Sequence, residues 1–112
     1  MEKILIGELG CIKNEALDAF AYKVISTIGL STKIDIVVGD LLYVDQDLFF
    51  LVKEVSVSKV VSPYITAVQV GPPSRTLAHM SNNDLATLLD AKVYKVTDRE
   101  TLRELKKELI SN

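Results

Sequence analysis

The chain has 112 residues, of which 48% are hydrophobic and 25% are charged. This length fits one domain, and the composition excludes collagen, low-complexity disorder and a disulfide-rich miniprotein. Thirteen basic and fifteen acidic residues give a net charge of −2, which disfavours a strongly basic nucleic-acid binder. Only 6% of the residues are aromatic and Trp is absent, so the core must be aliphatic, which favours strands.

The first quarter of the chain predicts one strand and one ambiguous segment. Residues 3–9 form a short apolar run that is typical of a strand. Residues 14–28 place apolar side chains at helical spacing, with Asn14 as an N-cap and Gly29 just past the end. Apolar residues also alternate over 20–24 as in a strand. Intrinsic propensity favours the helix.

The middle of the chain predicts a series of short antiparallel strands. They are expected at residues 33–38, 41–44, 48–55 and 64–70. Gly39-Asp40 and Asp45-Gln46-Asp47 supply turns, and Pro63 interrupts the apolar run before the last strand. Alternation predicts an aliphatic core made of Ile4, Ile6, Ile36, Val38, Leu42, Val44, Leu51, Val55, Ile65 and Val70.

The composition changes at residues 71–74, where Gly-Pro-Pro-Ser marks the expected end of the barrel. A short helix is expected after Ser81, and a short strand at 92–96. Thr97 and Glu100 then form a capping box. The helix that follows, about residues 98–110, carries an apolar stripe formed by Leu102, Leu105 and Leu109.

Together these elements predict a single α+β domain over residues 1–112. Its first part, 1–71, is a small, mainly antiparallel β-barrel that leaves room for a helix at 14–28. Its second part, 72–112, holds a Pro-Pro linker, a short helix, a short strand and an amphipathic C-terminal helix.

Residue types that carry enzyme chemistry are scarce. His79 is the single histidine and Cys11 the single cysteine, and no motif surrounds either one. Asp40, Asp45 and Asp47 cluster at one hairpin, but turn formation explains them. We therefore predict no catalytic, cofactor-binding or metal-ligating residue, and we expect the protein not to be an enzyme.

The candidate interface residues are Phe49, Phe50, Tyr64 and Leu105. In a strand, one of the two consecutive phenylalanines points inward and the other outward, where it can anchor a partner. The mean hydropathy of +0.24 and the exposed edge of a small sheet also favour association with a protein partner or with itself. We expect no membrane contact, no direct nucleic-acid ligand and, because no signal sequence is visible, a cytoplasmic location.

Five segments occur in an order that suggests a family. They are an Ile-Gly strand at 4–8, a Gly-Asp pair entering a strand at 37–44, a valine-rich strand at 50–55, Pro-Pro at 72–74 and paired leucines at 83–89. In this order they resemble the HAS-barrel, the small N-terminal barrel of HerA-type DNA-translocating ATPases. The resemblance implies a barrel that docks on a partner, and it would make residues 14–28 largely strand. The 112 residues contain no P-loop.

Two other functions stay open beside a non-enzymatic assembly module. A sugar phosphotransferase component of the sorbitol type, or another small-molecule binder, also has a small barrel with a Gly-Asp strand entry. That function would need His79 as the reactive group. A nucleic-acid-binding small barrel is disfavoured by the charge.

Overall fold

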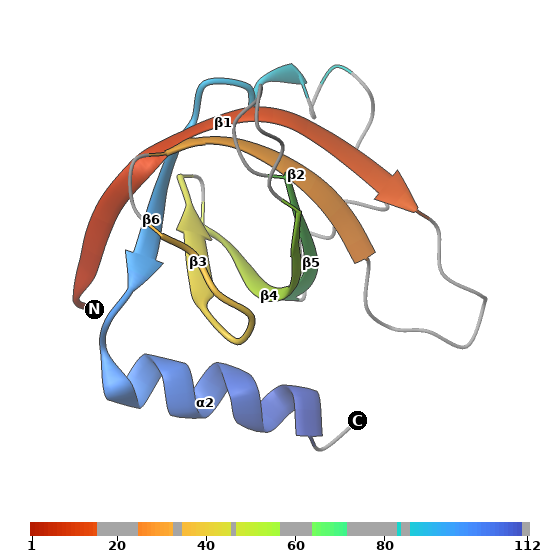
Figure 1. Cartoon of the computed structure of the whole chain (residues 1–112). Coiled ribbons are helices and arrows are strands. Elements are labelled where there is room, and N and C mark those ends of the chain that lie inside the picture. Colours follow the sequence, from red (N-terminus) through yellow and green to blue (C-terminus); the bar gives the residue numbers. More distant parts are fainter. Residues whose placement is uncertain are drawn as a thin grey trace.

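The computed structural model describes residues 1–15, 25–32, 35–45, 47–56, 64–71, 83 and 86–110. The strands are β1 (Lys3–Glu15), β2 (Ile25–Thr32), β3 (Leu41–Val44), β4 (Leu48–Ser56), β5 (Tyr64–Gly71) and β6 (Lys92–Val96), and they are followed by the helix α2 (Arg99–Ile110). All neighbouring strands are antiparallel, and the order β1-β2-β5-β4-β3-β6 closes into a barrel (Figure 1). The predicted antiparallel barrel is confirmed.

Strand β1 closes the barrel because it joins β6, the last strand in the chain, to β2. Its first half pairs with β6 and its second half with β2. Register shifts between Leu5 and Gly7, and between Leu9 and Cys11, are bulges that bend a strand. Figure 1 shows β1 and β2 arching together over one side of the barrel. Each of the six strands has a neighbour on both sides, so the sheet does not end in the exposed edge strand that we expected.

The inside of the barrel is filled by apolar side chains, which we call the interior cluster. It consists of Ile6, Leu9, Ile28, Leu30, Ile36, Leu42, Val44, Leu48, Phe50, Val52, Ile65, Ala67, Leu88 and Val93. Because side chains of a strand point alternately to its two faces, β2, β3, β4 and β5 contribute every second residue. In β1 the register shifts break this alternation, and Ile6 and Leu9 lie three positions apart. Ile36 and Leu88 come from segments outside the strands.

A second apolar cluster lies on the outer face of the barrel, and we call it the helix-side cluster. Its buried members are Leu41, Leu51, Val70 and Val96, and its half-buried members are Tyr43, Phe49, Leu102 and Leu105. Leu102 and Leu105 come from α2, which lies on the opposite side from the β1–β2 arch in Figure 1. Within the part of the chain that the structure describes, no helix has the length and hydropathy of a bilayer span.

Five predicted strands are present, and one is not. The strand predicted at 3–9 lies within β1, which continues to Glu15. Residues 41–44 and 92–96 match β3 and β6, whereas β4 and β5 each extend one residue beyond the prediction. The predicted strand at 33–38 is wrong over residues 35–38, which form coil and a turn, while 33–34 lie outside the described residues. The Asp40 amide donates a hydrogen bond to the Val37 carbonyl oxygen at 3.1 Å. Because residues 37–40 form this turn, they do not belong to a strand of the sheet.

The predicted helix at 14–28 is wrong at both ends. Asn14 belongs to β1 and pairs with Ser26 of β2, and residues 25–28 belong to that same strand. Pairing between the strands overrides the local helix propensity there. Residues 16–24 lie outside the described residues, as does most of the predicted short helix after Ser81, of which only Asn83 and Ala86 are described as helical.

Most of the predicted core is buried, with two errors. Ile6, Ile36, Leu42, Val44, Leu51, Ile65 and Val70 are buried, and Val55 is half-buried. Ile4 is 51% exposed because it lies at the start of β1, at the open end of the barrel. Val38 is 62% exposed because it belongs to the turn before β3 rather than to a strand.

Helix α2 begins one residue later than the predicted capping box requires. The N-cap is Asp98, whose carboxylate accepts hydrogen bonds from the Glu100 amide at 3.3 Å and the Thr101 hydroxyl at 2.6 Å. The hydrogen bond from Thr101 is the main cause that lowers the pKa of Asp98 below its usual 3.8. The Thr97 amide instead donates to the carbonyl oxygen of Glu2. The side chain of Leu109 lies outside the description, so the complete apolar stripe stays a prediction.

Candidate interaction surface

The two consecutive phenylalanines of β4 point to opposite faces of the sheet. Phe50 is 1% exposed and belongs to the interior cluster, so no partner can reach its ring. Phe49 is half-buried on the outer face, where its ring meets the Tyr43 ring edge-on at a centroid distance of 5.1 Å. Of this pair, only Phe49 can contact a partner.

The other two predicted interface residues lie in different places. Leu105 packs on the helix-side cluster, and its Cδ2 lies 3.7 Å from the position that a Cβ on Gly71 would occupy. Tyr64 is 39% exposed at the start of β5, beside Gly29 of β2. The four predicted residues therefore do not form one continuous surface.

An aromatic row crosses the outer face of β4, β3 and β6. Tyr43 is the cross-strand partner of Phe49 on one side and of Tyr94 on the other. The rings of Tyr43 and Tyr94 have centroids 6.0 Å apart and planes inclined at 51°. The Lys3 ammonium lies 4.5 Å from the Tyr43 centroid and 4.7 Å from the Tyr94 centroid.

A carboxylate holds Tyr43 in place. Its hydroxyl donates to Asp47 Oδ1 at 2.9 Å, across the β3–β4 turn. Burial raises the pKa of Tyr43 above its usual 10.0, and the hydrogen bond and negative charge of Asp47 raise it further. The phenol therefore stays neutral well into the alkaline range. Sequence reasoning missed Lys3, Tyr43 and Tyr94, because no local signal shows that β3 and β6 are neighbours.

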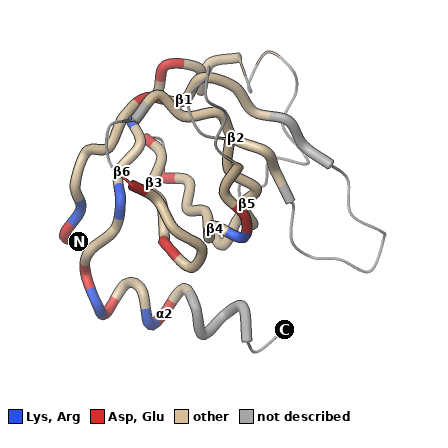
Figure 2. Tube along the Cα trace, in the orientation of Figure 1, with Lys and Arg blue, Asp and Glu red and all other residues tan. Residues whose placement is uncertain are grey.

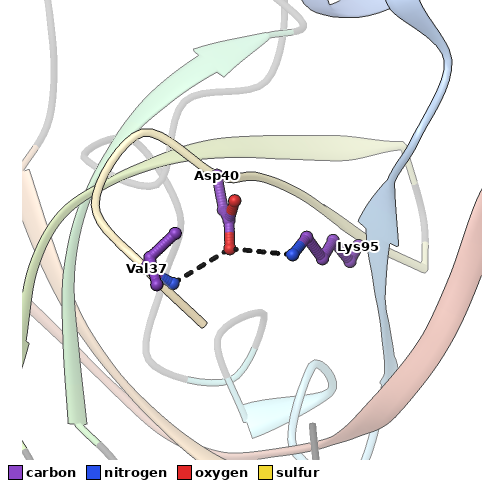
Figure 3. Close-up of polar contacts among 3 residues, drawn as sticks. All are labelled: Val37, Asp40 and Lys95. Carbon is purple, nitrogen blue, oxygen red and sulfur yellow. Dashed lines mark hydrogen bonds and ion pairs between the residues drawn. The ribbon is translucent and has the colours of Figure 1, made fainter. Parts of the chain in front are cut away.

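One end of the barrel carries an ion pair among exposed apolar residues. Asp40 Oδ2 lies 3.3 Å from Lys95 Nζ and also accepts a hydrogen bond from the Val37 amide at 3.0 Å (Figure 3). Val37 is 58% exposed and Val38 is 62% exposed, and Ile4, which is 51% exposed, pairs with Lys95 across the strands. We call Ile4, Val37 and Val38 the barrel-end patch.

Charged residues of both signs are mixed along the described chain. Figure 2 shows basic and acidic segments alternating on the strands and on α2 rather than gathering into a stripe of one sign. A duplex or single strand of nucleic acid needs such a positive stripe. The charge pattern of the described residues therefore gives no support to a nucleic-acid ligand, whose absence stays a prediction.

The groups that could carry catalysis do not come together in the described structure. Cys11 is half-buried on β1, while His79 lies outside the described residues, so the structure does not test their pairing. Asp40 is engaged by Lys95, and Asp47 by Tyr43. No group of three or more His, Cys, Asp or Glu side chains that could hold a metal ion occurs among the described residues.

Comparison with protein families, curated proteins and solved structures finds no match to this chain. The resemblance to HAS-barrels therefore stays a prediction that rests on the order of its sequence segments. The function has to be inferred from the surface of the barrel itself.

Proposed function

We propose that this barrel is a non-enzymatic module for protein–protein assembly, similar in role to the barrels that accompany DNA-translocating ATPases. The observation that carries the proposal is the barrel-end patch, where Ile4, Val37 and Val38 are each more than half exposed. Clustered exposed apolar side chains with polar neighbours are typical of interaction sites.

The two faces of the barrel wall are used differently. The described part of the interior is packed with side chains such as Phe50 and Leu42, which are at most 1% exposed. A described interior filled in this way supports binding on the outside of the barrel rather than inside it. This favours a docking function over the small-molecule alternative.

The ion pair at this end sets the character of the patch. Asp40 and Lys95 neutralise each other beside the valines, so the patch offers an apolar surface without excess charge. Such a surface suits an apolar patch on a partner protein, with the ion pair in the polar rim. The proposal therefore replaces Phe50 as an anchor with the two valines of the turn.

The test compares the wild-type protein with a variant in which both valines are polar. Sedimentation over a range of concentrations, alone and with a translocase encoded by a neighbouring gene, measures self-association and complex formation. V37S/V38S should weaken association at least about tenfold, since two anchors are lost. A melting temperature of the variant close to that of the wild type would show that the barrel is still folded.

Leu89→Ser is the matched control, because Leu89 is 45% exposed but lies outside the barrel-end patch. It should leave association unchanged. A wild-type protein that stays monomeric and binds no such partner would contradict the proposal. Equal effects of the control and the double variant would move the interface away from this end.

A further inference from the structure

The ammonium group of Lys3 lies between two aromatic rings on the outer face of the barrel. Its Nζ is 4.5 Å from the Tyr43 centroid and 4.7 Å from the Tyr94 centroid. Both distances fall within the roughly 6 Å over which a cation is attracted to the face of an aromatic ring. The two rings thus already hold a cation in this structure.

The two rings are held by contacts with neighbouring side chains, whereas the Lys3 ammonium ends an exposed side chain whose backbone belongs to β1. Tyr43 and Tyr94 are cross-strand partners on β3 and β6, and their planes meet at 51° to form a V-shaped site. The hydroxyl of Tyr43 is held by Asp47, and its ring is supported by Phe49. Lys3 is exposed and is the first residue of β1. The site therefore does not depend on the lysine for its shape.

We propose that Tyr43 and Tyr94 form a binding site for a methylated alkylammonium cation, which Lys3 fills in the free protein and which the ligand displaces. Aromatic pairs of this kind recognise quaternary ammonium groups through the negative faces of their rings. The carboxylate of Asp47, bonded to the Tyr43 hydroxyl, adds a negative charge next to the site. This site lies on the outer wall and is separate from the barrel-end patch, so it goes beyond the proposed assembly function.

Lys3 is a weak internal competitor. A cation–π contact at an exposed site has a small free energy, equivalent to about a two- to five-fold change in affinity. Removing the lysine should therefore raise the affinity for an added cation about two- to five-fold. The substitution K3A tests this without changing either ring.

The experiment titrates the full-length protein with tetramethylammonium while NMR follows the ring resonances of the tyrosines. A saturable shift of Tyr43 and Tyr94 in the millimolar range is expected, and it should be tighter in K3A. The neutral compound 3,3-dimethylbutan-1-ol, which has the shape of choline without the charge, should bind much more weakly. Choline and a peptide containing trimethyl-lysine then distinguish a free ligand from a modified protein.

Substitutions of the tyrosines distinguish loss of the binding site from loss of the fold. Y94L should abolish the shift and Y94F should keep it, because the ring face and not the hydroxyl holds the cation. Y64L is the control, since Tyr64 is an exposed tyrosine of β5. The proposal is overturned if K3A shows no saturable shift, if the neutral compound binds as well as the cation, or if Y94L binds like Y94F.

Discussion

Strands β3 and β4 differ from β2 in the number of faces that the protein covers. In β3, Leu42 and Val44 face the interior cluster while Leu41 faces the helix-side cluster. In β2, Ile28 and Leu30 face inward, and the residue between them is Gly29. A strand covered on both faces needs apolar residues at every position, whereas one covered on one face needs them at every second position.

The sequences of the strands show this difference directly. LLYV in β3 and LFFLV in β4 are continuous apolar runs, whereas Ser, Thr and Gly separate the apolar residues of ISTIGLST in β2. The helix α2 is the reason, because its Leu102 and Leu105 pack in the helix-side cluster with outward residues of β3, β4 and β5. The comparison predicts that the interior cluster holds the barrel together, and that the helix-side cluster adds a smaller stabilisation.

The largest expected effect is a difference in unfolding free energy between substitutions of the two phenylalanines of β4. Phe50→Ala should lower the free energy of unfolding by about 3–5 kcal/mol, because it opens a cavity in the interior cluster. Phe49→Ala should cost only about 1–2 kcal/mol, because the Phe49 ring is half-buried. Urea unfolding followed by circular dichroism measures both. Equal losses would mean that the two clusters contribute alike.

A smaller effect is expected where the helix meets the barrel. Leu105→Asp should cost about 2 kcal/mol, because it removes apolar contact and places a charge against the helix-side cluster. Hydrogen exchange should then show faster opening of α2 than of the strands. Glu104→Ala is the control, since Glu104 is exposed on the same helix. If Leu105→Asp melts like the wild type, α2 does not stabilise the barrel.

Two glycines, Gly29 of β2 and Gly71 of β5, test how closely other side chains approach the strands. A Cβ on Gly29 would lie 2.7 Å from Cys11 Sγ and 3.3 Å from Tyr64 Cε1, so Gly29→Ala should cost about 1–2 kcal/mol. A Cβ on Gly71 would meet only Leu105 and Phe49, at 3.7 and 3.9 Å, and should be tolerated.

The double variant C11A/G29A identifies the cause of the loss at Gly29. Removing the sulfur should restore part of the stability, because the closest clash is with Cys11 Sγ. A double-mutant cycle measured by urea unfolding gives the coupling between the two positions. Additive effects would show that the sulfur is not the obstacle.

Local signals predicted the parts of the fold that depend on local chemistry. The Gly39-Asp40 turn is present, with φ of 95° at Gly39, and β3 was predicted with its observed bounds. The prediction of a helix at 14–28 is wrong at its ends because Asn14 and Ser26 pair across strands. Intrinsic propensity takes no account of such pairing between distant residues. Alternation predicts Ile4 and Val38 in the core, and both are exposed, because alternation does not show where the barrel ends.

The candidate surface was harder to predict than the fold. The sequence predicts that one ring of Phe49 and Phe50 points inward and the other outward. Which ring points inward depends on the register of β4 against β3 and β5. The cation site joins residues from β1, β3 and β6, which are far apart in the sequence. Only the closure of the barrel brings them together.

The smallest expected effect concerns the cap of α2, where sequence and structure named different residues. Asp98→Ala should lower the melting temperature slightly, because the Glu100 amide and the Thr101 hydroxyl lose their acceptor. Thr97→Ala should not, since it keeps the backbone amide that donates to the Glu2 carbonyl oxygen. Thermal unfolding by circular dichroism measures both variants.

The pH dependence of this cap has a definite sign. Because the pKa of Asp98 is lower in the folded protein than its usual 3.8, the stabilisation is complete above that value and is lost as the pH falls through the lowered pKa. Thr101→Val removes the hydrogen bond that is the main cause, so it should move the Asp98 pKa, measured by NMR, up towards 3.8. An unchanged pKa in Thr101→Val would show that the helix amides, and not the hydroxyl, stabilise the carboxylate.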